Sequence, residues 1–84
     1  MDYIITFNTT HHALKAEKVL KTGNFALDLI PTPRAISSEC GFTVLVRNNK
    51  SSTLVHFIKK LNLSYNKIYK TFDHNGEEKY EEIS

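Results

Sequence analysis

Residues 3–23, YIITFNTTHHALKAEKVLKTG, change their hydrophobic period half-way along, and this change decides the fold. In residues 3–7 apolar side chains occupy both faces of an alternating pattern, which is typical of a strand buried on both sides. Further on, Ala13, Ala16 and Leu20 recur at helical spacing, while the lysines lie mostly outside this stripe. The stretch therefore predicts a central strand that is followed directly by a helix.

The ends of this helix carry residue types that suit its termini. Thr9 or Thr10 is expected to cap the first turn, because a hydroxyl oxygen can accept a hydrogen bond from an unpaired backbone N–H. Gly23 is placed to end the helix in a left-handed conformation.

Outward from this unit, the same patterns predict three more strands and one more helix. The strands are FALDLI (25–30), FTVLV (42–46) and NKIYKTF (66–72), and the helix is STLVHFIKKLN (52–62), with Asn62 as its left-handed final residue. The order β-α-β-β-α-β indicates the α+β class. It favours a ferredoxin-like sandwich, with a four-stranded antiparallel sheet and both helices on one face. The lysines of the last strand are typical of a sheet edge.

The length of 84 residues predicts one domain, which we place at residues 1–72. Residues 73–84 form an acidic C-terminal tail with five carboxylates and one lysine. Within the tail, His-Asn-Gly at 74–76 is a turn signal that would also fit a short hairpin.

Composition excludes several classes of protein. A net charge of +2 is too small to predict nucleic-acid binding, and no apolar run approaches the length of a membrane helix. The first residues lack the pattern of a signal peptide, so a cytoplasmic location is expected. A sheet face left uncovered on so small a domain favours a homodimer.

The segment PTPRAISSECG (31–41) is longer than a connection between two neighbouring strands requires, and it holds the only cysteine, Cys40. Two interpretations stay open: a reactive thiol presented by a stiff loop, or a small buried structural side chain. For the first, the residues expected to shape the loop or stabilise a thiolate are Thr32, Pro33, Arg34, Ser37, Ser38 and Gly41. Gly41 allows a backbone conformation closed to other residues and removes steric cover from Cys40.

Other chemistry is not predicted. His11 and His12 point about 100° apart on a helix and are poorly placed to share a metal ion. We expect no metal and no cofactor, since neither a phosphate-binding glycine loop nor a Ser-His-Asp arrangement can be assembled. Taking the first and third strands as parallel, we expect His11 to lie far from Cys40 within one chain.

Two stretches together carry a family resemblance: MDYIITFNTTHHALKAEKVLK and LIPTPRAISSECGF. They share a first strand that ends in Phe, a Thr-His-x-Ala-Leu-x-Ala-Glu helix start, and a Pro-Thr-Pro-Arg…Ser-Ser-x-Cys-Gly segment. In these features the chain resembles the small bacterial family of selenium/sulfur carrier-like proteins, earlier described as a domain of unknown function. The resemblance covers roughly residues 2–60.

The resemblance implies a carrier that accepts sulfur or selenium on Cys40 as a persulfide or selenopersulfide. A donor such as a cysteine desulfurase would supply the atom, and an acceptor protein would receive it. Such a carrier is a co-substrate rather than an enzyme with its own turnover. The alternative is a non-catalytic, dimeric ferredoxin-like regulatory or protein-interaction domain with a structural cysteine.

Overall fold

The computed structural model describes residues 2–23, 25–34, 36, 41–47 and 51–83. In chain order the elements are β1 (Tyr3–Thr6), α1 (Thr10–Lys21), β2 (Ala26–Pro31), β3 (Phe42–Arg47), α2 (Ser51–Lys60), β4 (Lys67–His74) and β5 (Glu77–Glu82). The elements expected from hydrophobic periodicity are all present, and their ends differ from expectation by one or two residues. The fifth strand is additional.

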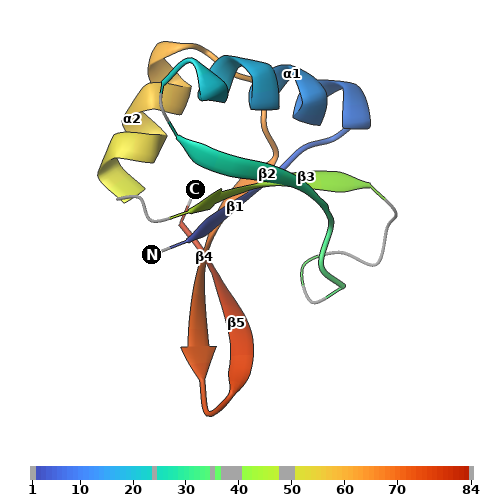
Figure 1. Ribbon diagram of the computed structural model, residues 1–84, viewed down its shortest axis with the longest axis vertical. Coiled ribbons are helices and arrows are strands. Elements are labelled where there is room, and N and C mark those ends of the chain that lie inside the picture. Colours follow the sequence, from blue (N-terminus) through green and yellow to red (C-terminus); the bar gives the residue numbers. More distant parts are fainter. Residues whose placement is uncertain (1, 24, 35, 37–40, 48–50, 84) are drawn as a thin grey trace.

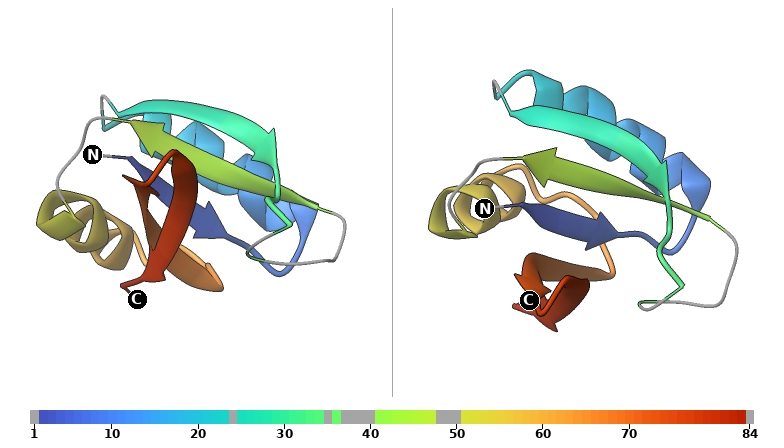
Figure 2. Two further views of the ribbon diagram at one scale, coloured as in Figure 1. Left: turned by 90° about the horizontal axis from the view of Figure 1, so that it is seen from below. Right: turned by 60° about the horizontal axis from the view of Figure 1, so that its bottom comes forward.

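The strands form one sheet in the order β2-β3-β1-β4-β5, in which every neighbouring pair is antiparallel. Figures 1 and 2 show this sheet with its two helices. The expectation of an α+β fold with an antiparallel sheet and two helices is confirmed, whereas the count of four strands is wrong. The position of β4 at the sheet edge is also wrong, because β4 lies between β1 and β5.

The extra strand arises from the turn signal within the acidic segment. His74 pairs with Glu77, and the two residues between them adopt positive φ, 53° at Asn75 and 83° at Gly76. Two successive positive φ values are the mark of the tight turn that matches strand twist in a two-residue hairpin. The hairpin alternative for residues 74–76 is therefore confirmed.

The charges of β5 are matched by lysines on β4. Lys67 Nζ lies 2.9 Å from Glu82 Oε1, and Lys70 Nζ lies 3.2 Å from Glu81 Oε2. These cross-strand pairs balance part of the negative charge of β5, while the two glutamate side chains stay at least half exposed. The division of the chain into a domain at 1–72 and a tail at 73–84 stays a prediction, because no observation tests whether residues 1–72 fold alone.

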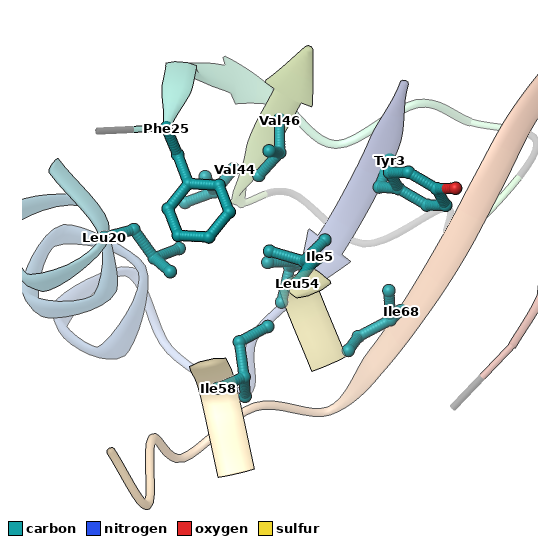
Figure 3. Close-up of a cluster of buried hydrophobic side chains, with 9 residues drawn as sticks. All are labelled: Tyr3, Ile5, Leu20, Phe25, Val44, Val46, Leu54, Ile58 and Ile68. Atoms are coloured by element: carbon teal, nitrogen blue, oxygen red, sulfur yellow. The ribbon is translucent and has the colours of Figure 1, made fainter. Parts of the chain in front are cut away.

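All four residues of β1 are buried, as expected for a central strand. Ile5 pairs with Val44 of β3 and with Ile68 of β4, so these side chains share one face of the sheet. On that face they form the core with Tyr3, Leu20, Phe25, Val46, Leu54 and Ile58 (Figure 3). Because this set draws on both α1 and α2, the two helices cover the same face. The β4–β5 hairpin projects away on the opposite side (Figure 1).

Helix termini follow the sequence expectations in two cases. The Thr9 hydroxyl accepts a hydrogen bond of 3.2 Å from the backbone N–H of His12, which caps α1. After α2, Asn62 adopts a left-handed φ of 54°, and Leu63 N–H donates to Ile58 O. This arrangement satisfies carbonyl groups that the end of a helix otherwise leaves unpaired.

Gly23 departs from expectation. It does not take the left-handed conformation, since Gly76 is the only described glycine with positive φ. Packing explains the glycine instead: a Cβ at residue 23 would lie 2.6 Å from Phe57 Cζ and 2.8 Å from Phe25 Cε2. These two rings pack edge to face with centroids 5.0 Å apart. A side chain at residue 23 would therefore push apart an aromatic pair at the border of the core.

We expect Gly23→Ala to lower the free energy of unfolding by about 1–3 kcal/mol, the usual cost of overpacking a well-packed site. The measurement is urea unfolding followed by circular dichroism. Gly41→Ala is the matched control, because among the described residues the nearest atom to its added Cβ is Thr32 Oγ1 at 3.8 Å, an ordinary contact. Equal effects of the two substitutions would contradict this account of Gly23.

Candidate functional site

The end of β1 and the start of β3 lie side by side at one end of the sheet. Antiparallel pairing of Ile5 with Val44 sets this register, so Phe7 and Phe42 follow at the same level. The expectation that the first and third strands are parallel is therefore wrong. That expectation was the reason for placing the β1–α1 turn far from the segment at 31–41, and it no longer holds. Figure 2 shows the start of α1, the end of β1 and the start of β3 together.

A cavity of about 430 Å³ lies at this end of the sheet. Four segments of the chain meet around it: the end of β1 with the turn into α1, the segment between β2 and β3, the start of β3, and the start of β4. The lining residues are Thr6, Phe7, Asn8, Thr9, Thr10, Thr32, Ile36, Gly41, Phe42, Asn66, Lys67 and Tyr69. The site is thus built from residues that are far apart in the sequence.

Polar groups without negative charge dominate this lining. Four threonines and two asparagines line the cavity, and no carboxylate is among the described residues that do so, Glu39 lying outside them. The cavity also borders the N-terminus of α1, whose first turn holds no acidic residue. Backbone N–H groups at a helix N-terminus carry partial positive charge. The electrostatic environment therefore suits a group with negative charge.

Hydrogen bonds hold the β1–β4 wall of the cavity. Lys67 N–H donates to Thr6 Oγ1 at 3.0 Å, and the Thr6 hydroxyl donates to Lys67 O at 3.3 Å. Asn66 N–H donates to Thr6 O at 2.7 Å. Three bonds between one buried threonine and two residues of another segment keep this wall in place, since each lost bond would leave a poorly solvated polar group.

Lys67 supplies the positive side chain of the site. The Glu82 carboxylate accepts a hydrogen bond from its ammonium and attracts its charge, and these two effects raise the pKa of Lys67 above the ordinary value of 10.5. About half of the Lys67 side chain remains exposed. Lys67 therefore keeps its charge at neutral pH while it stays accessible from solvent.

The structure brings two of the predicted site residues into the cavity wall. Thr32 and Gly41 both line it, and Thr32 N–H donates to Gly41 O at 3.0 Å, which closes the base of the segment between β2 and β3.

Other predicted site residues lie away from the cavity or outside the described residues. Ile36 N–H donates to Pro33 O at 3.0 Å, a bond between residues i and i+3 that is typical of a turn. Arg34 is exposed and does not line the cavity. Cys40, Ser37 and Ser38 lie outside the described residues, so the expected approach of Arg34 to Cys40 stays a prediction.

Several cavity residues were not predicted as site residues, namely Asn8, Asn66, Lys67 and Tyr69. The expected strand order could have predicted that these residues lie together. In a β-α-β-β-α-β sheet whose first strand is central, both neighbours of that strand run antiparallel to it, so both begin where it ends. His11 follows Thr10 in the chain but is not among the lining residues.

The chain was compared with known proteins. The model of the family described as "Putative Se/S carrier protein-like" matches residues 2–70, most of the chain. The chain belongs to this family. No curated protein and no solved structure matches it. The sequence resemblance is thereby confirmed, and the match includes the whole 31–41 segment and every lining residue of the cavity.

The described residues contain no group of three or more His, Cys, Asp or Glu side chains arranged to hold a metal ion, and Cys40 lies outside them. Neither of the helices, over the part of the chain that the structure describes, is long and apolar enough to cross a membrane.

We expect the pKa of Lys67, followed by the ¹³Cε shift in an NMR titration, to lie above the ordinary lysine value of 10.5. Because this pKa is raised by folding, the stabilisation from the Lys67–Glu82 pair is present below about pH 10.5 and is lost as the pH rises through the raised value. Glu82→Gln should lower the Lys67 midpoint. Glu81→Gln, which removes the partner of Lys70 instead, should leave that midpoint in place. A Lys67 midpoint equal in the wild type and Glu82→Gln would contradict the assignment.

Proposed function

We propose that this protein carries sulfur or selenium between proteins, as a persulfide or selenopersulfide on Cys40. The family match carries the proposal, because it covers the segment with the only cysteine of the chain and names selenium and sulfur carriers. A carrier implies a donor protein and an acceptor protein. We assign the donor role to a protein that holds a cysteine persulfide, such as a cysteine desulfurase.

The transfer is a thiol exchange in which the carried atom changes partners. The Cys40 thiolate attacks the outer sulfur of the donor persulfide, the donor S–S bond breaks, and the donor cysteine leaves as a thiolate. The product is a persulfide on Cys40. An acceptor nucleophile then attacks the outer sulfur and releases the Cys40 thiolate. No external oxidant or reductant is required, and a single cysteine is sufficient because no internal resolving thiol takes part.

The cavity supports the proposal through its position and charge. Gly41, the residue after Cys40, lines it, and so does Thr32 at the other end of the same segment. The amides of Asn8 and Asn66 and the ammonium of Lys67 can donate hydrogen bonds, which stabilise an anion such as a thiolate or persulfide. We assign loop-shaping or anion-stabilising roles to Pro33, Arg34, Ser37 and Ser38 as part of this proposal.

The same proposal includes a cytoplasmic location, since reducing conditions there keep a single thiol free.

We also propose that the first four strands and both helices form a ferredoxin-like fold, with β5 added at the border of the sheet. The strand order β2-β3-β1-β4 supports that class. The family match favours a carrier over the alternative of a regulatory domain with a structural cysteine.

We expect Cys40→Ser to abolish uptake of sulfur from a persulfide-loaded desulfurase while the protein still folds. Intact-mass spectrometry after incubation with donor and cysteine should show wild-type protein heavier by one sulfur atom and Cys40→Ser unchanged. Circular dichroism and urea unfolding check the fold of the variant.

A relocated thiol tests whether the surroundings of residue 40 matter. The double variant Cys40→Ser with Thr53→Cys moves the only thiol to an exposed position on α2, away from the cavity. If transfer depends on the site, this variant should take up sulfur far more slowly than the wild type. Wild-type protein that gains no sulfur, or a relocated thiol that gains it equally fast, would refute the carrier function.

A further inference from the structure

The outer edge of β2 is a border of the sheet, and no strand of the described residues pairs with it. Figure 2 shows β2 along this border, with α1 behind it on the helix-covered face. An unpaired strand edge exposes backbone N–H and C=O groups that can accept another strand, so proteins usually protect such edges.

The alternating hydrogen bonds between β2 and β3 show which backbone groups of β2 point away from β3. Thr32 N–H donates to Gly41 O, so Thr32 and every second residue before it bond inward to β3. The residues between them, Leu27, Leu29 and Pro31, therefore direct their backbone groups to the free edge. Pro31 has no N–H and fits this outward position, since an inward proline would cost the sheet a bond.

The two border strands differ in their protection. In β5 every residue except Tyr80 is charged, and four are glutamates. Pairing of β5 with a second copy of itself would therefore be opposed by repulsion between like charges. In β2 the only charged residue is Asp28, and its carboxylate already pairs with Arg47 of β3 at 2.5 Å. β2 contains no lysine, a residue type that discourages pairing at a strand edge. The apolar side chains of Leu27, Leu29 and Ile30 are only partly buried.

We propose that a second copy of this chain docks on the outer edge of β2, through antiparallel pairing of the two β2 strands about a two-fold axis at Leu29. In this register Leu29 faces Leu29 of the second copy and both exchange N–H···O bonds. Leu27 N–H donates to Pro31 O of the second copy on either side of the axis, which makes four bonds. The two sheets become one continuous sheet.

Charge and hydrogen bonding select this register among its neighbours. An axis at Asp28 would also allow four bonds, but it would place the two Asp28 carboxylates opposite each other, which is unfavourable. An axis at Ile30 would leave only two bonds, because Pro31 cannot donate. With the axis at Leu29, Asp28 faces Ile30 of the second copy on the face away from the helices.

This interface differs from the sheet-face dimer that the sequence suggested. On that face Ile4 is already 1% exposed and Thr43 is fully buried within one chain. The edge proposal is also independent of the carrier function, because no residue of Ala26–Pro31 lines the cavity.

The test compares two substitutions that remove the same apolar side chain and differ in charge. Ile30→Glu places a carboxylate opposite Asp28 of the second copy, whereas Ile30→Lys places an ammonium there. Sedimentation equilibrium of the full chain, in a Cys40→Ser background that excludes disulfide-linked pairs, gives the dimer dissociation constants. We expect a concentration-dependent dimer. Ile30→Glu should weaken this dimer about tenfold more than Ile30→Lys, because both symmetric contacts of residue 30 with Asp28 of the second copy are repulsive in the first variant and attractive in the second.

Lys79→Glu on β5 is the control for the other border strand and should leave the dissociation constant unchanged. A chain that stays monomeric up to about 1 mM, where even weak specific pairs with millimolar constants would be half formed, would overturn the proposal. Equal weakening by Ile30→Glu and Ile30→Lys, or weakening by Lys79→Glu as strong as that by Ile30→Glu, would also overturn it. Sulfur uptake by Ile30→Glu, measured with Cys40 intact, should equal that of the wild type, which separates this test from that of the carrier function.

Discussion

The antiparallel pairing of β1 with both β3 and β4 is the constraint on which the rest of the structure depends. Ile5 lies between Val44 and Ile68, and the helices pack on the face that these three residues share. A shift of one residue in either pairing would turn Tyr3 and Ile5 to the opposite face. Because all of β1 is buried, burial on both faces specifies its register strongly.

The same pairing creates the candidate site. Since both neighbours of β1 run antiparallel to it, β3 and β4 begin where β1 ends, and the N-terminus of α1 follows directly. Threonine and asparagine side chains from these ends meet around one cavity, with Lys67 as its cation. The described part of this lining holds no carboxylate, and it suits the anionic sulfur or selenium atom of the proposed carrier function.

Features that depend on neighbouring residues were predicted well. Periodicity located both helices and the first four strands, and the hydroxyl cap at Thr9 and the left-handed Asn62 were both found in the structure. Features that depend on distant residues were not. Gly23 is a glycine because of Phe25 and Phe57, not because of its backbone angle. The acidic residues after Asp73 pair with β4, where Lys67 and Lys70 contact Glu82 and Glu81.

The sequence by itself determined the order of the elements, the single thiol in a long segment and the membership of the family. Side-chain spacing along the chain is enough for this, because helices and strands bury their apolar residues with different periods. Only the tertiary structure decided the direction of β3 relative to β1, the choice between tail and hairpin for residues 73–84, and the grouping of Thr6, Thr32, Gly41 and Lys67 around one cavity. These features depend on which segments meet in space, and pairing between distant strands is set by the burial of the whole sheet rather than by any local pattern.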